Sequence, residues 1–249
     1  MRNIESCFCN ILLVLFFLCV FAPPGASGFE IPEKLVYDLK WSGIKAGTAT
    51  LRIADEKDSI KIVSTARSAD WVSFFYTVDD RIVARLTRNP ARPYLGLPLR
   101  YRVKIREGRH RRDKEVIFDH GNHNATFIDH LDDDKKNVEI LADTFDPLSS
   151  FYYVRTLKLE VGKPVFVNIF DSRKMWNVEV QILRKERITT KLGTFDTVLI
   201  KPLMKSEGIF NRKGAMYIWL TDDDKHLPVK LQTKVAIGHI TATLVSGHY

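Results

Sequence analysis

Alternation of apolar and polar residues with a period of two runs through most of the chain from Lys34 onward and limits the folds open to it. Every second residue between Leu35 and Trp41 is apolar or aromatic, and the same period returns between Ala49 and Ile53. This period places successive side chains on opposite faces of a β-strand. Two glycine-containing pairs lie between these two runs, Ser42-Gly43 and Ala46-Gly47, so we expect a β-hairpin with glycines at the turn.

Similar strand-like segments follow along the rest of the chain. Their expected ranges are 60–65, 81–87, 99–106, 114–118, 124–131, 138–141, 164–170, 176–187, 197–203, 215–220, 228–235 and 239–245. Roughly a dozen strands with short polar connections predict an all-β, mainly antiparallel fold. A sheet of this size protects its edges by curling or closing, so we expect a curved sheet or a β-barrel-like single domain.

Two segments depart from the strand pattern. The range 143–158 predicts one short helix, because Asp146 is a good N-cap residue and Pro147 suits the first helical position. One helix among many strands either plugs or lines the concave side of the curved sheet or simply packs as part of the core. The range 68–78 predicts a short helical or irregular segment packed by Trp71, Phe74 and Phe75.

The N-terminus has the three parts of a secretory signal. Arg2 begins a short polar region, Ile11–Phe21 is an uninterrupted apolar run, and residues 26–28 supply small side chains for cleavage before Phe29. A transmembrane anchor needs about 20 apolar residues, and the run is shorter than that. Lipid attachment at Cys19 is disfavoured because a bulky leucine precedes it. We therefore expect residues 1–28 to be a cleaved signal peptide, residues 29–249 to form one β-rich domain without a transmembrane anchor, and the periplasm to be its location.

Cysteine content and charge limit the chemistry of that domain. All three cysteines lie within the predicted signal peptide: Cys7, Cys9 and Cys19. The mature domain thus has no thiol for a disulfide or for catalysis. Its formal charge of +8 favours anionic lipid headgroups or acidic glycans as partners, rather than nucleic acid, outside the cytoplasm. The sequence carries no signal for an oligomeric state.

A basic hairpin is expected around a turn at residues 107–108. With that turn, Arg106 faces Arg109, Lys104 faces Arg111, and two acidic residues, Asp113 and Glu115, face Arg102 and Arg100. The opposite face carries Leu99, Tyr101, Val103 and Ile105. Like charges at the tip are either an anion-binding patch, formed by Lys104, Arg106, Arg109 and Arg111, or a solvated hairpin whose charges prevent aggregation.

No motif indicates catalysis or a metal. The three histidines between residues 120 and 130 (His120, His123 and His130) lack standard zinc spacing. The aspartate triplets at 132–134 and 222–224 lack the alternation of a calcium loop and are typical of turns. The chain also lacks a Gly-x-Ser-x-Gly elbow and an HExxH helix. The sequence therefore predicts no catalytic residues, no metal site and no cofactor.

Four segments carry a resemblance to a known family. They are LVYDLKWSGIKAGTATL, DTFDPLSSFYYVRTLKLEVG, KLGTFDTVLIKPL and GAMYIWLTDDDKHLPVKLQTKVAIGHITATL, in this order along the chain. Together they resemble the bacterial family called domain of unknown function 3108, which is found in exported envelope proteins. The resemblance covers the mature chain and implies a predominantly β, barrel-like fold. It implies no activity and transfers no catalytic residue.

Three functions fit these observations. The first is a non-enzymatic periplasmic binding or carrier protein for a lipid or another apolar envelope ligand, with Trp41, Phe151, Tyr152 and Trp219 lining the apolar site. The second is an envelope interaction or assembly factor that docks on anionic glycan or a protein partner through the basic hairpin. The third, an envelope hydrolase, requires a cleft in which carboxylates or histidines converge.

Overall fold

The computed structural model describes residues 28–88, 95–171, 173–203, 215–235 and 237–249. The predicted signal peptide therefore lies almost wholly outside the described residues. Neither helix in these ranges has the length and apolar character of a membrane span.

Fourteen strands and two helices form the described chain. The strands are β1 (Glu33–Trp41), β2 (Ile44–Glu56), β3 (Ser59–Ser68), β4 (Asp79–Thr87), β5 (Pro98–Glu107), β6 (His110–Asp119), β7 (Asn124–Asp129), β8 (Asp134–Glu139), β9 (Val165–Asp171), β10 (Lys174–Thr190), β11 (Gly193–Leu203), β12 (Met216–Thr221), β13 (Pro228–Lys234) and β14 (His239–His248). The helices are α1 (Asp70–Ser73) and α2 (Pro147–Arg155).

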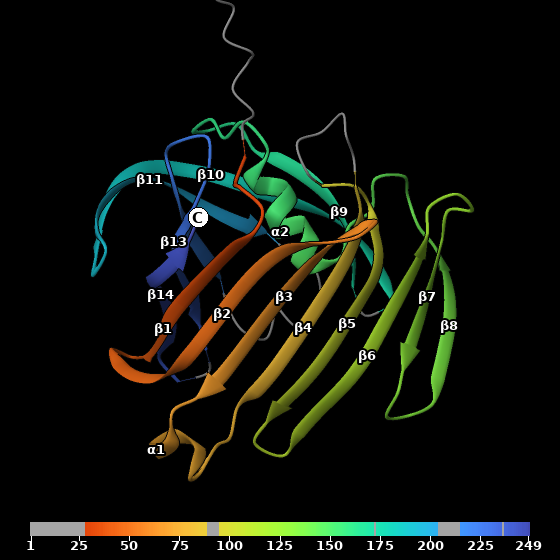
Figure 1. Cartoon of the computed structure of the whole chain (residues 1–249), viewed down its shortest axis with the longest axis horizontal. Coiled ribbons are helices and arrows are strands. Elements are labelled where there is room, and N and C mark those ends of the chain that lie inside the picture. Colours follow the sequence, from red (N-terminus) through yellow and green to blue (C-terminus); the bar gives the residue numbers. More distant parts are fainter. Residues whose placement is uncertain (1–27, 89–94, 172, 204–214, 236) are drawn as a thin grey trace, which may run out of the picture.

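All fourteen strands belong to one antiparallel sheet. Their spatial order is β8-β7-β6-β5-β4-β3-β2-β1-β14-β13-β12-β11-β10-β9, so chain neighbours pair and the first strand joins the last. The sheet curls around α2 but does not close, because β8 and β9 remain its two edges (Figure 1). The predicted curved, all-β, mainly antiparallel fold is confirmed, with slightly more strands than expected and a second, very short helix.

The β1–β2 hairpin shows why the alternation was informative. Trp41 pairs with Ile44, which leaves Ser42 and Gly43 as a two-residue turn. Both have positive φ, 46° and 95°, as a type I′ turn requires. The turn was therefore predictable from the residues that separate the two alternating runs.

The core consists of two clusters of buried side chains. The larger joins β1–β7, α2 and the C-terminal strands, and includes Leu35, Ile62, Phe127 and Tyr152. The smaller lies between α2 and β9–β12, and includes Val167 and Ile200. The helix contacts both clusters and lies on the concave side of the curved sheet, one of the two placements expected.

The sequence correctly predicted α2 and its cap. Asp146 adopts an extended backbone, and its carboxylate accepts hydrogen bonds from the amides of Leu148 and Ser149. The segment before the helix is tied to the β9 edge, since the Phe145 amide donates to the Asn168 carbonyl (2.8 Å) and the Phe170 amide to the Phe145 carbonyl (2.8 Å). These contacts cover part of an otherwise open sheet edge.

The predicted packing of the other helical segment is wrong. The segment does begin with the one-turn helix α1, but Trp71, Phe74 and Phe75 are exposed instead of buried. The reason is position: α1 lies at the end of β3, where the strands have ended and no layer remains to cover it (Figure 1).

Candidate functional site

Side chains of the described residues form a trough on the inner face of the sheet that is large enough for a ligand. Alternation along β5 turns Tyr101, Val103 and Ile105 inward, and β6 adds Val116 from the next strand. The trough measures about 390 Å³, within the range of roughly 300–1,000 Å³ that small-molecule sites occupy. Its other lining residues are Ser64, Asp80, Ile82, Glu107, Arg112, Lys114, Glu115, Phe127, Pro147, Leu148, Asp171, Met216 and Thr233.

A smaller apolar cavity of about 100 Å³ adjoins the trough. Pro147 and Met216 line both spaces, so the first turn of α2 stands between them. Phe151 and Val154 of α2 face this cavity together with branched side chains of β9–β11. A larger hollow of about 530 Å³ opens at the ends of β12–β14, but it lies on the outside of the molecule and is less enclosed.

The polar end of the trough is built around Phe127. The Lys114 ammonium lies 5.5 Å from the centroid of its ring, and the Arg173 guanidinium lies 4.7 Å from it. Lys114 also forms an ion pair with buried Asp129 (Nζ–Oδ2 3.5 Å). Arg112 faces the same space, and its Nε donates to Nε2 of His110 (2.8 Å). The trough therefore combines an apolar floor with charged groups of both signs: the basic side chains are Arg112 and Lys114, and the acidic ones are Asp80, Glu107, Glu115 and Asp171. This arrangement suits an amphipathic ligand.

The N-cap of α2 places a buried carboxyl group beside this space. Asp146 is fully buried, and its side chain accepts hydrogen bonds from the Ser149 hydroxyl (2.7 Å), the Ser149 amide (2.9 Å) and the Leu148 amide (2.8 Å). Burial raises the pKa of Asp146 to about 6, although these hydrogen bonds act in the opposite direction.

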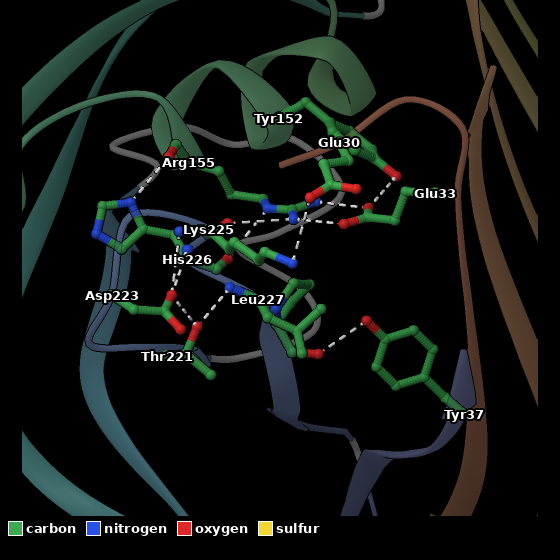
Figure 2. Close-up of polar contacts among 11 residues, drawn as sticks. Glu30, Glu33, Tyr37, Tyr152, Arg155, Thr221, Asp223, Lys225, His226 and Leu227 are labelled. Carbon is green, nitrogen blue, oxygen red and sulfur yellow. Dashed lines mark hydrogen bonds and ion pairs between the residues drawn. The ribbon is translucent and has the colours of Figure 1, made fainter. Parts of the chain in front are cut away.

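A buried ion pair fixes the other end of α2 (Figure 2). The Arg155 guanidinium donates to both carboxylate oxygens of Glu33 (2.8 and 2.7 Å), and neither side chain is more than 1% exposed. Its remaining donors reach the carbonyls of His226 (3.0 Å) and Lys225 (3.3 Å). Arg155 thus connects α2 to β1 and to the β12–β13 turn.

Aromatic rings surround this ion pair. The Arg155 guanidinium lies 4.3 Å from the ring centroid of Phe29 and 5.0 Å from that of Tyr152. Burial raises the pKa of Tyr152 well above its ordinary value, and the Glu33 carboxylate adds to the effect. The hydroxyl therefore stays protonated and donates to Glu33 (3.3 Å). This arrangement positions the helix.

The four aromatic residues predicted to line an apolar site do not come together. Phe151 lines the smaller cavity, and Tyr152 lies against the Glu33–Arg155 ion pair. Trp41 is partly exposed at the end of β1 and donates to the Ile237 carbonyl (2.8 Å). Trp219 is buried away from the trough, where its indole donates to Glu186 (2.6 Å).

The basic hairpin exists, but its register differs from the prediction by two residues. The turn consists of Gly108 and Arg109, so Arg106 faces Arg111 and Lys104 faces Asp113. Gly108 takes a φ of 56°, which moves the turn one residue toward the C-terminus because glycine tolerates this conformation. Arg106 and Arg111 still place like charges opposite each other at the tip.

One residue of the predicted apolar face points outward. Leu99 is 40% exposed, whereas Tyr101, Val103 and Ile105 line the trough as expected. Arg85 pairs with Arg100 and Leu86 with Pro98, so Leu99 is an extra residue at a β-bulge. A bulge reverses the alternation locally.

The predicted histidine and aspartate segments are parts of turns and ion pairs. His120 donates a hydrogen bond from Nε2 to the Pro98 carbonyl (2.9 Å), and His130 lies 2.8 Å from the buried Glu115 carboxylate. Asp223 accepts hydrogen bonds from the amides of Lys225 and His226. Among the residues that the structure describes, no three histidine, cysteine or acidic side chains are grouped to hold a metal ion.

Most residues that line the trough were not singled out from the sequence. Ile82, Met216 and Phe127 come from strands far apart in the chain, and only the curl of the sheet brings them to one space. The available signal was their place on the apolar side of each alternating run. Residues of the packed core lie on the same apolar side of these runs, so the alternation cannot distinguish a trough-lining residue from a core residue.

Comparisons with known proteins support the fold and give no activity. The family model described as "Protein of unknown function (DUF3108)" matches residues 36–245. A β-barrel-like protein of the domain of unknown function DUF1849 from Brucella abortus has a similar structure, with a TM-score of 0.56 and 10% identity over 87% of this chain and 96% of that chain. A putative exported protein with a YmcC-like fold from Bacteroides fragilis aligns with a TM-score of 0.36 and 9% identity, over 89% and 98% of the two chains. No curated protein matches the sequence.

Proposed function

Because this chain belongs to the DUF3108 family of proteins of unknown function, we propose its function from the trough itself: it is an exported, non-enzymatic carrier that binds an acyl chain of an envelope lipid. The observation that carries the proposal is an apolar trough on the inner face of an unclosed sheet. A domain that only needed a stable core would fill this space, since protein interiors are close-packed. The predicted signal peptide supports a location outside the cytoplasm.

The composition of the trough favours an amphipathic ligand. Val103, Ile105 and Leu148 offer apolar surface, and the smaller cavity behind Pro147 extends it. Lys114 and Arg112 lie where a carboxylate or phosphate at the end of the chain would need a counter-charge. We therefore place the acyl chain along the trough and its polar end near Phe127, where Lys114 and Arg173 lie over the ring while ion-paired with Asp129 and Asp134.

Filling the trough should abolish binding without unfolding the protein. Val103→Trp adds a large ring to a partly exposed side chain that faces open space, so it displaces ligand instead of overpacking the core. The full chain is expressed with its own N-terminus, and the protein is purified from a bacterial periplasm without detergent. Native mass spectrometry should detect a fatty acid or phospholipid adduct on the wild type and at least a tenfold weaker adduct on the variant.

Ile117→Trp is the matched control, because Ile117 lies on β6 but points to the outer face and is 43% exposed. It should retain the adduct. A wild-type protein that stays free of adduct after incubation with envelope lipids would refute the carrier. So would an equal adduct on Val103→Trp.

A further inference from the structure

A cluster of exposed aromatic residues lies at one end of the sheet. Trp71, Phe74, Phe75 and Tyr76, here called the aromatic loop, lie in α1 and directly after it. Phe74 is 94% exposed and Phe75 61% exposed. In Figure 1, α1 projects beyond the strand ends at the bottom of the molecule. Contiguous exposed apolar surface of this kind marks an interaction site.

The aromatic loop is held in place by polar contacts at its base. The Trp71 indole donates to the Lys45 carbonyl (3.0 Å), and the Trp71 and Phe75 rings lie 5.9 Å apart. The Ser68 and Ser73 hydroxyl groups are hydrogen-bonded to each other (2.6 Å). Before the loop, the Ala69 amide donates to the Ala46 carbonyl (2.8 Å), and after it the Thr77 carbonyl accepts from the Gly108 amide (2.8 Å). The rings are thus presented outward by a fixed scaffold, which lowers the entropic cost of docking.

The aromatic loop contacts the tip of the basic hairpin. The Gly108 amide donates to the Thr77 carbonyl (2.8 Å). A Cβ atom at Gly108 would lie 2.8 Å from the Tyr76 ring, so the turn and the ring are in close contact. Residues 104–112, here called the basic tip, contain five basic side chains and one acidic one, Glu107. Aromatic and cationic groups therefore share one end of the molecule.

Two nearby carboxylates are engaged within the protein. Asp79 forms an ion pair with Arg67 (3.2 Å), and Asp80 accepts a hydrogen bond from the Arg106 amide (3.0 Å). The Arg111 guanidinium donates to the carbonyls of Gly108 and His110 (2.8 Å each), which fixes its charge beside the turn. Among the described residues, the side chains of Arg106, Arg109 and Arg111 form no ion pair with a carboxylate within 4.0 Å. The basic tip therefore presents net positive charge to the solvent.

We propose that the aromatic loop and the basic tip together dock the protein on the surface of an anionic phospholipid bilayer. Tryptophan and tyrosine favour the interface between headgroups and acyl chains, and exposed phenylalanines enter the apolar layer beneath it. Arginines beside them bind lipid phosphates. The aromatic loop projects beyond the strand ends (Figure 1), which fits insertion into a fluid layer. This inference is independent of the trough, although a lipid carrier would benefit from such contact.

Co-sedimentation with vesicles tests the proposal. The wild type should bind vesicles of equimolar phosphatidylcholine and phosphatidylglycerol more tightly than vesicles of phosphatidylcholine alone. Phe74→Ser/Phe75→Ser should weaken binding by about tenfold or more, because both rings lose their apolar contact. Arg106→Ala/Arg109→Ala should weaken binding to the anionic vesicles about thirtyfold, at roughly fivefold for each basic residue near the surface.

Matched controls separate docking from general stickiness. Phe166→Ser removes a phenylalanine of β9 that is 56% exposed, and Lys158→Ala/Lys163→Ala removes two exposed cations in the loop after α2. Both should bind like the wild type. Brominated phosphatidylglycerol should quench tryptophan fluorescence in the wild type, and Trp71→Phe should remove most of that quenching.

Two results would overturn the docking surface: no binding of the wild type to anionic vesicles, as expected if the surface serves a protein partner, or unchanged binding of Phe74→Ser/Phe75→Ser. Val103→Trp distinguishes the two proposals. It should still bind vesicles if only the trough is blocked, and the Phe74→Ser/Phe75→Ser variant should still carry the acyl adduct.

Discussion

Arg155→Met should lower the free energy of unfolding by about 3–5 kcal/mol, because it leaves the Glu33 carboxylate buried without its counter-charge. Both side chains are almost completely inaccessible to solvent, so water cannot replace the lost partner. The carbonyls of Lys225 and His226 lose a donor as well. Urea denaturation of the purified protein measures the change as a lower transition midpoint at constant slope.

A double variant identifies the cause of this loss. Glu33→Gln/Arg155→Met removes both charges and keeps a group that can accept the Tyr152 hydroxyl, so it should be more stable than Arg155→Met alone. Arg184→Met is the matched control. Its ion pair with Glu186 is largely exposed, and its loss should cost less than about 1 kcal/mol. An Arg155→Met variant no less stable than Arg184→Met would show that the buried pair does not anchor α2.

Asp146→Asn should change how stability depends on pH. Burial raises the pKa of Asp146 from 3.8 to about 6, so the folded protein binds a proton that the unfolded chain has released between these pH values. The resulting stabilisation is complete below pH 3.8 and is lost as the pH rises through about 6. The loss amounts to about 3 kcal/mol, at 1.36 kcal/mol per pH unit. Asparagine caps a helix as well as aspartate does but does not titrate.

The measurement is the free energy of unfolding of wild type and Asp146→Asn at several pH values between 4 and 7. As the pH rises across this interval, the free energy of unfolding of the variant should increase by up to about 3 kcal/mol relative to that of the wild type. Subtracting the wild-type value from the variant value at each pH cancels the titration of the other groups. The opposite trend, with the wild type gaining on the variant as the pH rises, would mean that the Leu148 and Ser149 amides outweigh burial and hold the carboxyl group ionised.

The buried groups at the two ends of α2 have different consequences for a carrier. Arg155 attaches the helix to the sheet through a charge pair, so its loss affects the whole fold. Asp146 sets the start of the helix, next to Pro147, which lines both the trough and the smaller cavity. A change at this N-cap therefore moves the wall between the two spaces. Adduct formation by Asp146→Asn, measured beside its stability, would report whether that wall matters for binding.

The docking surface and the trough meet on the β5–β6 hairpin, because Ile105, Glu107 and Arg112 of the basic tip also line the trough. Tyr101, Val103 and Ile105 of β5 line the trough, and the same strand continues to the basic tip. Arg112 of β6 is the last residue of the basic tip and faces the trough. A bilayer bound at the tip of the β5–β6 hairpin would thus lie next to one end of the trough. This geometry connects the two proposals without making either depend on the other.

Local sequence determined the elements of this protein. Period-two alternation placed the strands, Ser42 and Gly43 set the first turn, and Asp146 with Pro147 set the start of α2. These features act through a few neighbouring residues, so they can be identified without the fold. The fold class followed from the number of such strands and from the resemblance to the family. Strand β8 was placed less well, because its charged edge sequence lacks alternation.

Tertiary structure decided which side chains form a site. Phe127, Met216 and Val103 face one trough because the sheet curls, and no short-range pattern encodes that curl. A glycine with positive φ moved the basic turn by one position, and a bulge turned Leu99 outward. The aromatic residues after β3 looked like core residues, since an apolar side chain is the same in either setting. Their exposure depends on whether another layer covers them, and at the end of the sheet none of the described elements does.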